Sequence, residues 1–459
     1  MRTAALYGTI AACIAAAILL FSTQGGPEYT VDAFHRFSQH PNFSGPHDGL
    51  PVPHKPSHSG TRLRGPWKFD YKRDGRKHGL TESQCDAAFP LLYHEIDRAV
   101  KYRRRVGKLV ESEVDVGWRG DGIVRASIHA NELYIIDAHG VSDHNHRPRS
   151  IATLHALDRA VSASSEPLPT IEFTLTDHDS ALLNPHGNDT TWAYSRLAHQ
   201  ESLWLMPDFG FWAWPDVGLR SYAELQTALE DSEADFANKK SQLVWRGSLN
   251  VGSGQDARKG LLHHSQDQLW SDVQTLDWSN KSNIDERLLT MEDHCAYKFT
   301  AQTEGNTYSG RLKYLLNCHS VVLSHSLDWI EHYHHLLAPS GTSQNYIKLK
   351  RDFSDLPKTM QGLLQTSKKS GDAQSIADNA KALFRERYLT PAANSCYWRA
   401  LIRGWASVQG FEPELFEERD VPGKGMVRRR RGAPFESYVI MEAVDWDIPA
   451  KARKVCIDE

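Results

Sequence analysis

Strands and helices alternate along the second half of the chain, and no other feature of the sequence constrains the fold as strongly. Apolar runs typical of buried strands end at Arg246, begin at Val321 and cover residues 346–349. Helical patterns begin at Asp256, Tyr308 and Trp329 and cover residues 356–364 and 373–388. This alternation is typical of a parallel sheet covered by helices. We therefore predict an α/β fold.

The first half of the sequence also shows helix and strand patterns. A capping box at Thr81 predicts a helix over residues 81–101. Strand patterns at 123–129 and 133–136 predict a hairpin, and a strand over Ile171–Thr176 stops at Asp177.

The chain is too long for one ordinary core, so we expect two domains. We place their boundary in or just after a helix expected near residues 222–238, which gives domains of residues 66–235 and 236–411. The remaining residues, 412–459, are expected to form an irregular basic tail.

The N-terminus predicts translocation across a membrane. Arg2 precedes an uncharged, apolar stretch over residues 4–21, which predicts a short transmembrane signal anchor within residues 1–24. A cleaved signal peptide is the alternative. Residues 25–65 are rich in Pro, Gly, Ser and His and are expected to form a disordered stem. Glycosylation sequons agree with a lumenal location, at Asn42, Asn188 and Asn280.

Charge and cysteine usage exclude two classes of function. The net charge is −4 and basic residues are scattered, apart from 428–431, so no nucleic-acid partner is expected. Five cysteines follow the apolar stretch, and none shows the C-x-x-C spacing of a zinc site. A zinc site is therefore not expected.

Two turns carry the chemistry of an anion site. In residues 304–318, small and polar residues run into an amphipathic helix with Arg311 in its first turn, which is typical of a diphosphate site. An ordinary helix start with a solvated arginine is the alternative. Trp245-Arg246-Gly247-Ser248, followed by Arg258, repeats the pattern at a strand end.

Several ordered blocks over about residues 80–405 resemble glycosyltransferase family 90, which holds fungal capsule-associated transferases and Rumi-type protein O-glucosyltransferases. The blocks are Trp245–Ser248, Asp293–Lys298, Glu304–Cys318, Asp328–Glu331, Tyr388–Pro391 and Cys396–Trp398. The resemblance implies a GT-B architecture, with two Rossmann-like domains facing a cleft. It also implies a nucleotide-sugar donor bound mainly by the second domain, inversion at the anomeric carbon, and no metal requirement.

The resemblance also implies roles for individual residues. UDP would contact Ser248, Arg258, Asn306, Thr307, Tyr308, Ser309, Gly310 and Arg311, with Arg311 neutralising the diphosphate. Further candidate donor or acceptor contacts are Trp212, Trp214, Pro215, Arg246, Gly247 and Glu304. The family pairs cysteines at the positions of Cys295 with Cys318, and Cys85 with Cys396 resemble a second pair.

An inverting transfer needs one base beside the acceptor hydroxyl, and a carboxylate suffices. The family places an aspartate after an N-terminal-domain strand, where this chain has Asp177, and Asp179 is the second candidate. Two alternatives remain open: an Asp-x-Asp metal site, and aspartates that are merely solvated turn residues. A histidine group at His332, His334 and His335 is interpreted as a polar helix end.

These observations predict an inverting transferase that moves glucose or xylose from a UDP-sugar to a glycan or protein hydroxyl. It would be a single-pass type II protein of the Golgi or endoplasmic reticulum membrane with a lumenal catalytic part. A lumenal nucleotide-sugar or glycan-binding scaffold without turnover is the alternative from another class.

Overall fold

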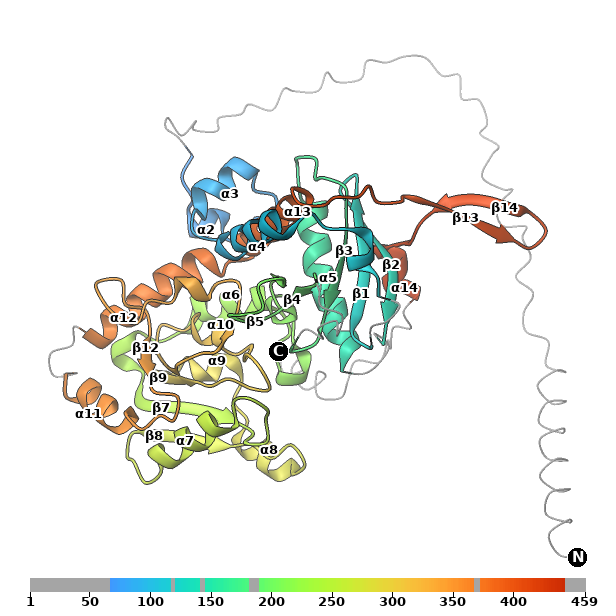
Figure 1. Cartoon of the computed structure of the whole chain (residues 1–459). Helices are drawn as coiled ribbons and strands as arrows, with labels where there is room; N and C mark the ends of the chain where they lie inside the picture. The colour runs from blue at the N-terminus through green and yellow to red at the C-terminus, as the bar shows by residue number, and fades with distance from the viewer. Residues whose placement is uncertain (1–66, 117–119, 141–144, 181–189, 367–371, 442–459) are drawn as a thin grey trace, which may run out of the picture. The chain divides into compact units, whose positions relative to one another are not determined.

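The computed structural model describes residues 67–116, 120–140, 145–180, 190–366 and 372–441 (Figure 1). All of these residues belong to one compact unit. The predicted signal anchor and stem, and two of the three sequons, lie outside the described residues. Within these ranges, none of the helices combines the length and apolar character needed to cross a bilayer.

A mixed six-stranded sheet belongs mainly to the first half, in the order β15-β2-β1-β3-β4-β6. Its strands are β1 (Ile123–His129), β2 (Glu132–His139), β3 (Ile171–Thr176), β4 (Trp192–Ala193), β6 (Trp204–Leu205) and β15 (Ala433–Pro434). β1 is antiparallel to β2 and β3, whereas β3, β4 and β6 are parallel. The predicted hairpin is confirmed, and its turn residues Ala130 and Asn131 both have positive φ. The antiparallel pairs depart from the parallel sheet of a Rossmann-like domain.

The second sheet has five parallel strands in the order β12-β10-β9-β7-β8. They are β7 (Lys240–Gly247), β8 (Ser271–Thr275), β9 (Tyr297–Gln302), β10 (Val321–His325) and β12 (Ile347–Leu349). Helices α7 (Gln255–Ser265), α11 (Leu356–Thr366) and α12 (Asp372–Ala380) share its apolar core. The predicted parallel α/β half is confirmed, while the GT-B arrangement and the boundary at 235 stay predictions. Counted along the chain the strand order is 2-1-3-4-5, so the topology switches between β7 and β9.

A late helix completes the core of the first half. α13 (Pro391–Ala406) packs on α4 (His94–Val106) and α5 (His146–Ser162) (Figure 1). Trp405 from this helix lies 5.7 Å from Trp192 and 5.2 Å from Trp204, measured between ring centroids. All three indoles are buried.

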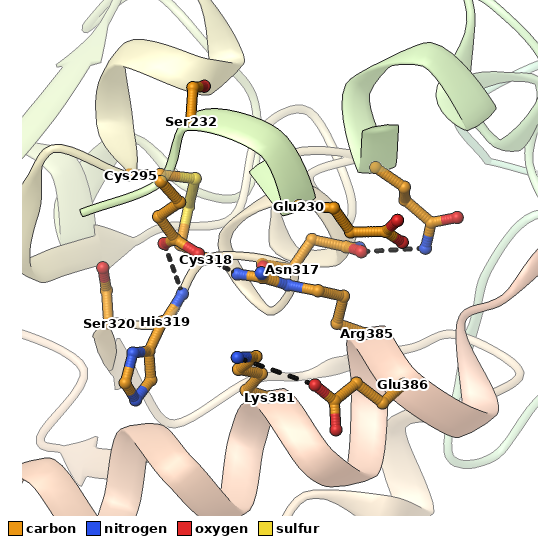
Figure 2. Close-up of polar contacts among 12 residues, drawn as sticks. Glu230, Ser232, Cys295, Asn317, Cys318, His319, Ser320, Lys381, Arg385 and Glu386 are labelled. Carbon is orange, nitrogen blue, oxygen red and sulfur yellow. Dashed lines mark hydrogen bonds and ion pairs between the residues drawn. A yellow bond between two sulfur atoms is a disulfide. The ribbon is translucent and has the colours of Figure 1, made fainter. Parts of the chain in front are cut away.

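Both predicted disulfides are present. Cys85–Cys396 joins α3 (Glu82–Ala88) to α13, across 311 residues of sequence. Cys295–Cys318 joins the segment after α9 (Met291–His294) to the segment after α10 (Leu312–Leu315). Figure 2 shows the second bridge beside Arg385, whose Nε donates to the Asn317 carbonyl. The disulfide and this buried hydrogen bond thus fix the chain just after α10.

Three predicted elements differ from the structure. The helix over 81–101 is broken into α3 and α4, because Pro90 cannot donate a backbone hydrogen bond within a helix. The helix expected from Tyr308 begins only at Leu312. The helix expected from Trp329 is wrong, since Trp329–Ile330 form β11, antiparallel to β5 (Arg196–Leu197).

The described part of the predicted tail, residues 412–441, is not irregular. Strands β13 (Phe416–Val421) and β14 (Gly425–Arg430) form a hairpin, β15 pairs with β2, and α14 (Phe435–Met441) contacts the same strand (Figure 1). The remaining elements are α2 (Tyr71–Asp74), α6 (Tyr222–Ser232), α8 (Lys281–Arg287), a π-helix at Lys381–Tyr388, and 3-10 turns at Glu111–Val114, Phe209–Phe211, Pro215–Val217, Phe236–Asn238 and His334–Leu336.

Candidate functional site

A cavity of about 850 Å³ opens at the carboxyl ends of β7, β8 and β9. Ligands of open α/β sheets bind at such a topological switch point, and the volume suits a small organic ligand. Its lining combines residues from both halves: Arg149, Asp179, Phe209, Trp214, Val217, Gly247, Ser248, Leu249, Asn250, Val251, Arg258, Thr275, Leu276, Asp277, Trp278, Ser279, Met291, Gly305, Asn306, Tyr308, Ser309, Gly310 and Arg311.

The two predicted anion turns form one structure at this cavity. Gly252 N donates to Asn306 Oδ1 (2.9 Å), and Gly254 N donates to the Gly305 carbonyl (2.8 Å). A Cβ on Gly254 would lie 2.1 Å from the Glu304 carbonyl oxygen, so only glycine permits this approach. Glycines thus bring the loop after β7 against the loop after β9.

Arg311 is a sheltered cation. Its Nε is buried and has no hydrogen-bond partner among the described residues. Burial lowers the pKa of Arg311 to about 9, and the nearby Arg258 and Arg246 contribute to the shift. The guanidinium is therefore still charged at neutral pH. A buried charge without an anionic partner is costly, so this position favours an anionic ligand.

Arg258 both shapes the site and adds charge to it. Its Nε donates to the Glu304 carbonyl (2.9 Å) and its guanidinium donates to the Ser248 carbonyl (2.7 Å). The Arg258 and Arg311 guanidinium carbons lie 5.7 Å and 5.8 Å from the centre of the Trp245 ring. Burial lowers the pKa of Arg258 to about 10. The two cations therefore flank one buried indole at the cavity.

Lys313 fixes the turn that carries Arg311. Its ammonium is buried, forms an ion pair with Asp208 (2.7 Å) and donates to the Gly310 carbonyl (2.7 Å). Because the charge is compensated, Lys313 supports the turn, whereas Arg311 is left for a ligand.

Nine of the predicted donor or acceptor contacts line the cavity: Trp214, Gly247, Ser248, Arg258, Asn306, Tyr308, Ser309, Gly310 and Arg311. Trp212 and Pro215 lie outside the described lining, and Trp212 stacks on His155.

Three further predicted contacts have other partners. Arg246 pairs with Asp272 (2.8 Å), and buried Glu304 accepts from two backbone amides and pairs with Arg351 (2.9 Å). The Thr307 hydroxyl donates to the Asp179 carbonyl (2.7 Å). These three residues therefore contact other parts of the protein and are not among the residues that line the cavity.

The lining also holds residues that the sequence patterns did not reveal. Thr275 ends β8 and residues 276–279 follow it, and the strand sequence Ser-Asp-Val-Gln-Thr lacks the apolar run of a buried strand. Arg149 belongs to α5 and forms an ion pair with Asp179 (2.9 Å). The acid–arginine pair was not detectable because 30 residues separate its members in sequence.

Asp177 is buried directly after β3. Its Oδ1 lies 2.6 Å from His146 Nδ1, and its Oδ2 accepts from the Ser150 hydroxyl. Burial raises the pKa of the Asp177 carboxyl, and the hydrogen bonds from Ser150 and His146 offset part of the rise. Asp177 lies outside the described lining, whereas Asp179 is part of it.

The two aspartates do not converge on a common ligand. The Asp177 carboxylate binds His146 and Ser150, and the Asp179 carboxylate binds Arg149. Among the described residues, one group of side chains lies close enough together to hold a metal ion. It consists of His146, Asp177 and His178 and does not include Asp179. The geometry therefore disfavours the Asp-x-Asp interpretation.

The second histidine group has structural partners. His332 is buried, His334 binds the Glu331 carboxylate (3.0 Å), and His335 binds the Leu91 carbonyl (2.6 Å). The interpretation as a polar helix end is wrong, since His332 is inside the fold and His334 and His335 begin a short 3-10 turn.

Comparison with known proteins agrees with this geometry. The model of a protein family described as "Glycosyl transferase family 90" matches residues 90–451 of the chain. The chain is 28% identical to protein O-glucosyltransferase 1 of Homo sapiens over 217 residues, which cover 43% of this chain and 52% of the relative. It is 35% identical to protein O-glucosyltransferase 1 of Rattus norvegicus over 186 residues (40% and 44%). It is 24% identical to O-glucosyltransferase rumi of Drosophila melanogaster over 271 residues (53% and 62%).

These alignments span about half the length of the curated relatives, whereas the family match covers most of the chain. The chain therefore belongs to glycosyltransferase family 90.

Proposed function

We propose that this chain is an inverting glycosyltransferase that moves a sugar from a UDP-sugar to a hydroxyl group. The observation that carries the proposal is the cavity at the switch point, into which two glycine-rich turns and the uncompensated Arg311 are built. A diphosphate supplies the charge that Arg311 lacks, and charge-assisted hydrogen bonds to it are strong.

The donor would lie along the ends of three strands. Arg311, Arg258 and the turn at Ser309 and Gly310 would hold the diphosphate, and Arg311 would stabilise the charge that develops on UDP as it leaves. Trp278 lines the other part of the cavity with 56% of its surface exposed, and it offers an aromatic face to the nucleobase.

Asp177 is the proposed base. Its raised pKa makes the carboxylate a better proton acceptor than an ordinary surface aspartate. An acceptor hydroxyl would reach it by replacing the hydrogen bond from Ser150 or His146. Asp179 is the second candidate, because it lines the cavity.

The relatives favour a protein acceptor, since their names describe O-glucosyl transfer to protein. Glucose or xylose is the proposed sugar, and a glycan hydroxyl is the other acceptor class. The two disulfides favour an oxidising compartment. We place the catalytic part in the lumen of the Golgi or endoplasmic reticulum, on a single-pass type II anchor, and propose turnover without a metal.

One observation favours a second candidate, a nucleotide-sugar-binding scaffold. Both oxygens of Asp177 already have a hydrogen-bond partner and the residue is fully buried, so an acceptor hydroxyl has no open approach to the base.

A UDP-release assay separates these proposals. The full-length chain is incubated with a panel of UDP-sugars and acceptors, with and without EDTA. We expect UDP release that is insensitive to EDTA and lost in Asp177→Asn. Release that requires a metal contradicts the metal-free mechanism, while UDP binding without release from any donor supports the scaffold.

A further inference from the structure

Three side chains that can ligate a metal converge behind the donor cavity. One ligand atom from each of His146, Asp177 and His178 lies within 4.8 Å of the others. The two imidazole rings are 4.5 Å apart between centroids, and the Asp177 side chain is fully buried. His146 opens α5, and the other two residues follow β3, so the group is assembled from two separate elements.

A glycine makes room for this group. A Cβ on Gly122 would lie 2.4 Å from Asp177 Oδ1, 2.7 Å from His146 Nδ1 and 2.9 Å from His178 Cδ2. Gly122 has φ of +73°, and its carbonyl accepts from Asp177 N (2.9 Å). The three side chains thus meet over a backbone position that carries no side chain.

The backbone also orients the second imidazole. His178 Nε2 lies 2.6 Å from the Asp121 carbonyl oxygen, which can accept a hydrogen bond from the ring. Histidines that bind metals commonly have one ring nitrogen held by a carbonyl or carboxylate, which fixes the ring.

The chemistry of the donor set selects the metal. Two imidazoles and one carboxylate suit Zn²⁺ and similar late transition metals, whereas Mg²⁺ and Ca²⁺ prefer oxygen ligands. Three protein ligands leave a further position for water, as in open zinc sites.

We propose that His146, Asp177 and His178 form a Zn²⁺ site whose occupation inhibits the enzyme. The inhibition, but not the binding, rests on the proposed function, in which Asp177 is the base. On binding, Zn²⁺ is held by the neutral imidazole of His146 through Nδ1, whose hydrogen bond to Asp177 is lost as the ring proton moves to Nε2. The carboxylate lone pair is then bound to the metal and cannot accept the proton of an acceptor hydroxyl.

Binding is tested without substrate on the full-length chain with any affinity tag removed. Titration calorimetry with Zn²⁺, and visible absorption with Co²⁺ as the spectroscopic probe, should give one site per chain. His178→Gln should weaken binding by about 10-fold or more. His263→Gln is the matched control, because His263 is an exposed histidine whose ring lies 4.8 Å from that of His264. Equal loss in the control, or no saturable site in the parent, overturns the proposal.

Inhibition by Zn²⁺ is tested with the UDP-release assay. Zn²⁺ should inhibit the parent at concentrations that fill the site, EDTA should restore activity, and His178→Gln should need about 10-fold more Zn²⁺. Stimulation by Zn²⁺ overturns the proposal. If His178→Gln does not fold, His146→Gln takes its place, and an upward shift of the parent's unfolding midpoint by Zn²⁺ provides a test without variants. Because binding is measured apart from turnover, an inactive chain contradicts the proposed function alone.

Discussion

The two sides of the site differ in how their charges are satisfied. On the donor side, Arg311 is half-buried, and its buried Nε has no partner among the described residues. On the base side, both oxygens of Asp177 already have hydrogen bonds. The donor side is thus ready for an anion, whereas the base side must exchange a hydrogen bond before it can act. An uncompensated charge marks the place of a ligand more clearly than a carboxylate that is already satisfied.

The largest expected effect tests the base side. Asp177→Asn should lower turnover by about 10²–10⁴-fold, because an amide cannot accept the acceptor's proton, while UDP affinity stays near that of the parent. Turnover and UDP affinity are measured on the same preparations. Asp179→Asn is the comparison variant. A larger loss in Asp179→Asn than in Asp177→Asn would move the base to the lining residue.

The next effect tests the donor side. Arg311→Met should weaken UDP binding by about 100-fold, or about 2.8 kcal/mol, because it removes the half-buried charge that lines the cavity. Arg246→Met is the control, since Arg246 pairs with Asp272 outside the described lining. We expect the control to lower the unfolding temperature with little change in UDP affinity. Calorimetric titration with UDP distinguishes the two variants, and equal affinities would contradict the assignment.

A backbone substitution tests how tightly the base is held. Gly122→Ala should lower turnover by about 10-fold, since a 1 Å displacement of catalytic groups can cost up to about 100-fold, and its methyl group would overlap Asp177 Oδ1. Gly423→Ala is matched for backbone strain, because Gly423 has φ of +78° but no atom within 4 Å of its added Cβ. Both variants should lose about 1–3 kcal/mol of stability from the strain. Only Gly122→Ala should lower turnover by more than its loss of stability explains.

The pH profile tests the same carboxylate more finely. Asp177 must be ionised to act as a base, and burial raises its pKa above the usual value of 3.8. Activity should therefore fall with falling pH at a higher pH than for an exposed aspartate. Ser150→Ala removes a hydrogen bond that lowers this pKa, so the acid limb of the kcat/KM profile should move to still higher pH. A shift to lower pH would contradict the role of Ser150.

The smallest effect concerns the link between the two sides. The Thr307 hydroxyl in the donor turn donates to the Asp179 carbonyl, two residues after the base (2.7 Å). Thr307→Val should lower kcat by about 5-fold, corresponding to one neutral hydrogen bond of about 1 kcal/mol. The KM for the donor should stay nearly constant. A change confined to the KM for the donor would instead indicate direct contact with UDP.

Local sequence signals located only part of the fold: of the five parallel strands, β7, β10 and β12 were predicted, whereas β8 and β9 were not. β3 was predicted with the observed bounds, and the hairpin of β1 and β2 was found from its strand pattern. β8 was missed because four of its five residues are polar, which does not resemble a buried strand. The helix predicted from Trp329 failed because tertiary pairing with β5 decides the conformation there.

The site was predictable only in part. Glycines and Arg311 mark the anion turns, because close backbone approach and permanent charge are tied to residue type. Residue type did not distinguish Arg311 from Arg246, since only folding shows that Asp272 compensates one of the two. Likewise, Arg149 and His146 reach the site from a helix that carries no motif, so long-range packing alone brings them there.

The return of α13 to the first half has a consequence for biosynthesis. Trp405 fills the core between Trp192 and Trp204, and Cys396 in the same helix bridges to Cys85. A nascent chain released from the ribosome tunnel up to residue 235 therefore lacks the helix that closes its own hydrophobic interior. The first half cannot mature before the second has been synthesised, and a fragment cut at the predicted domain boundary would expose these tryptophans to chaperones.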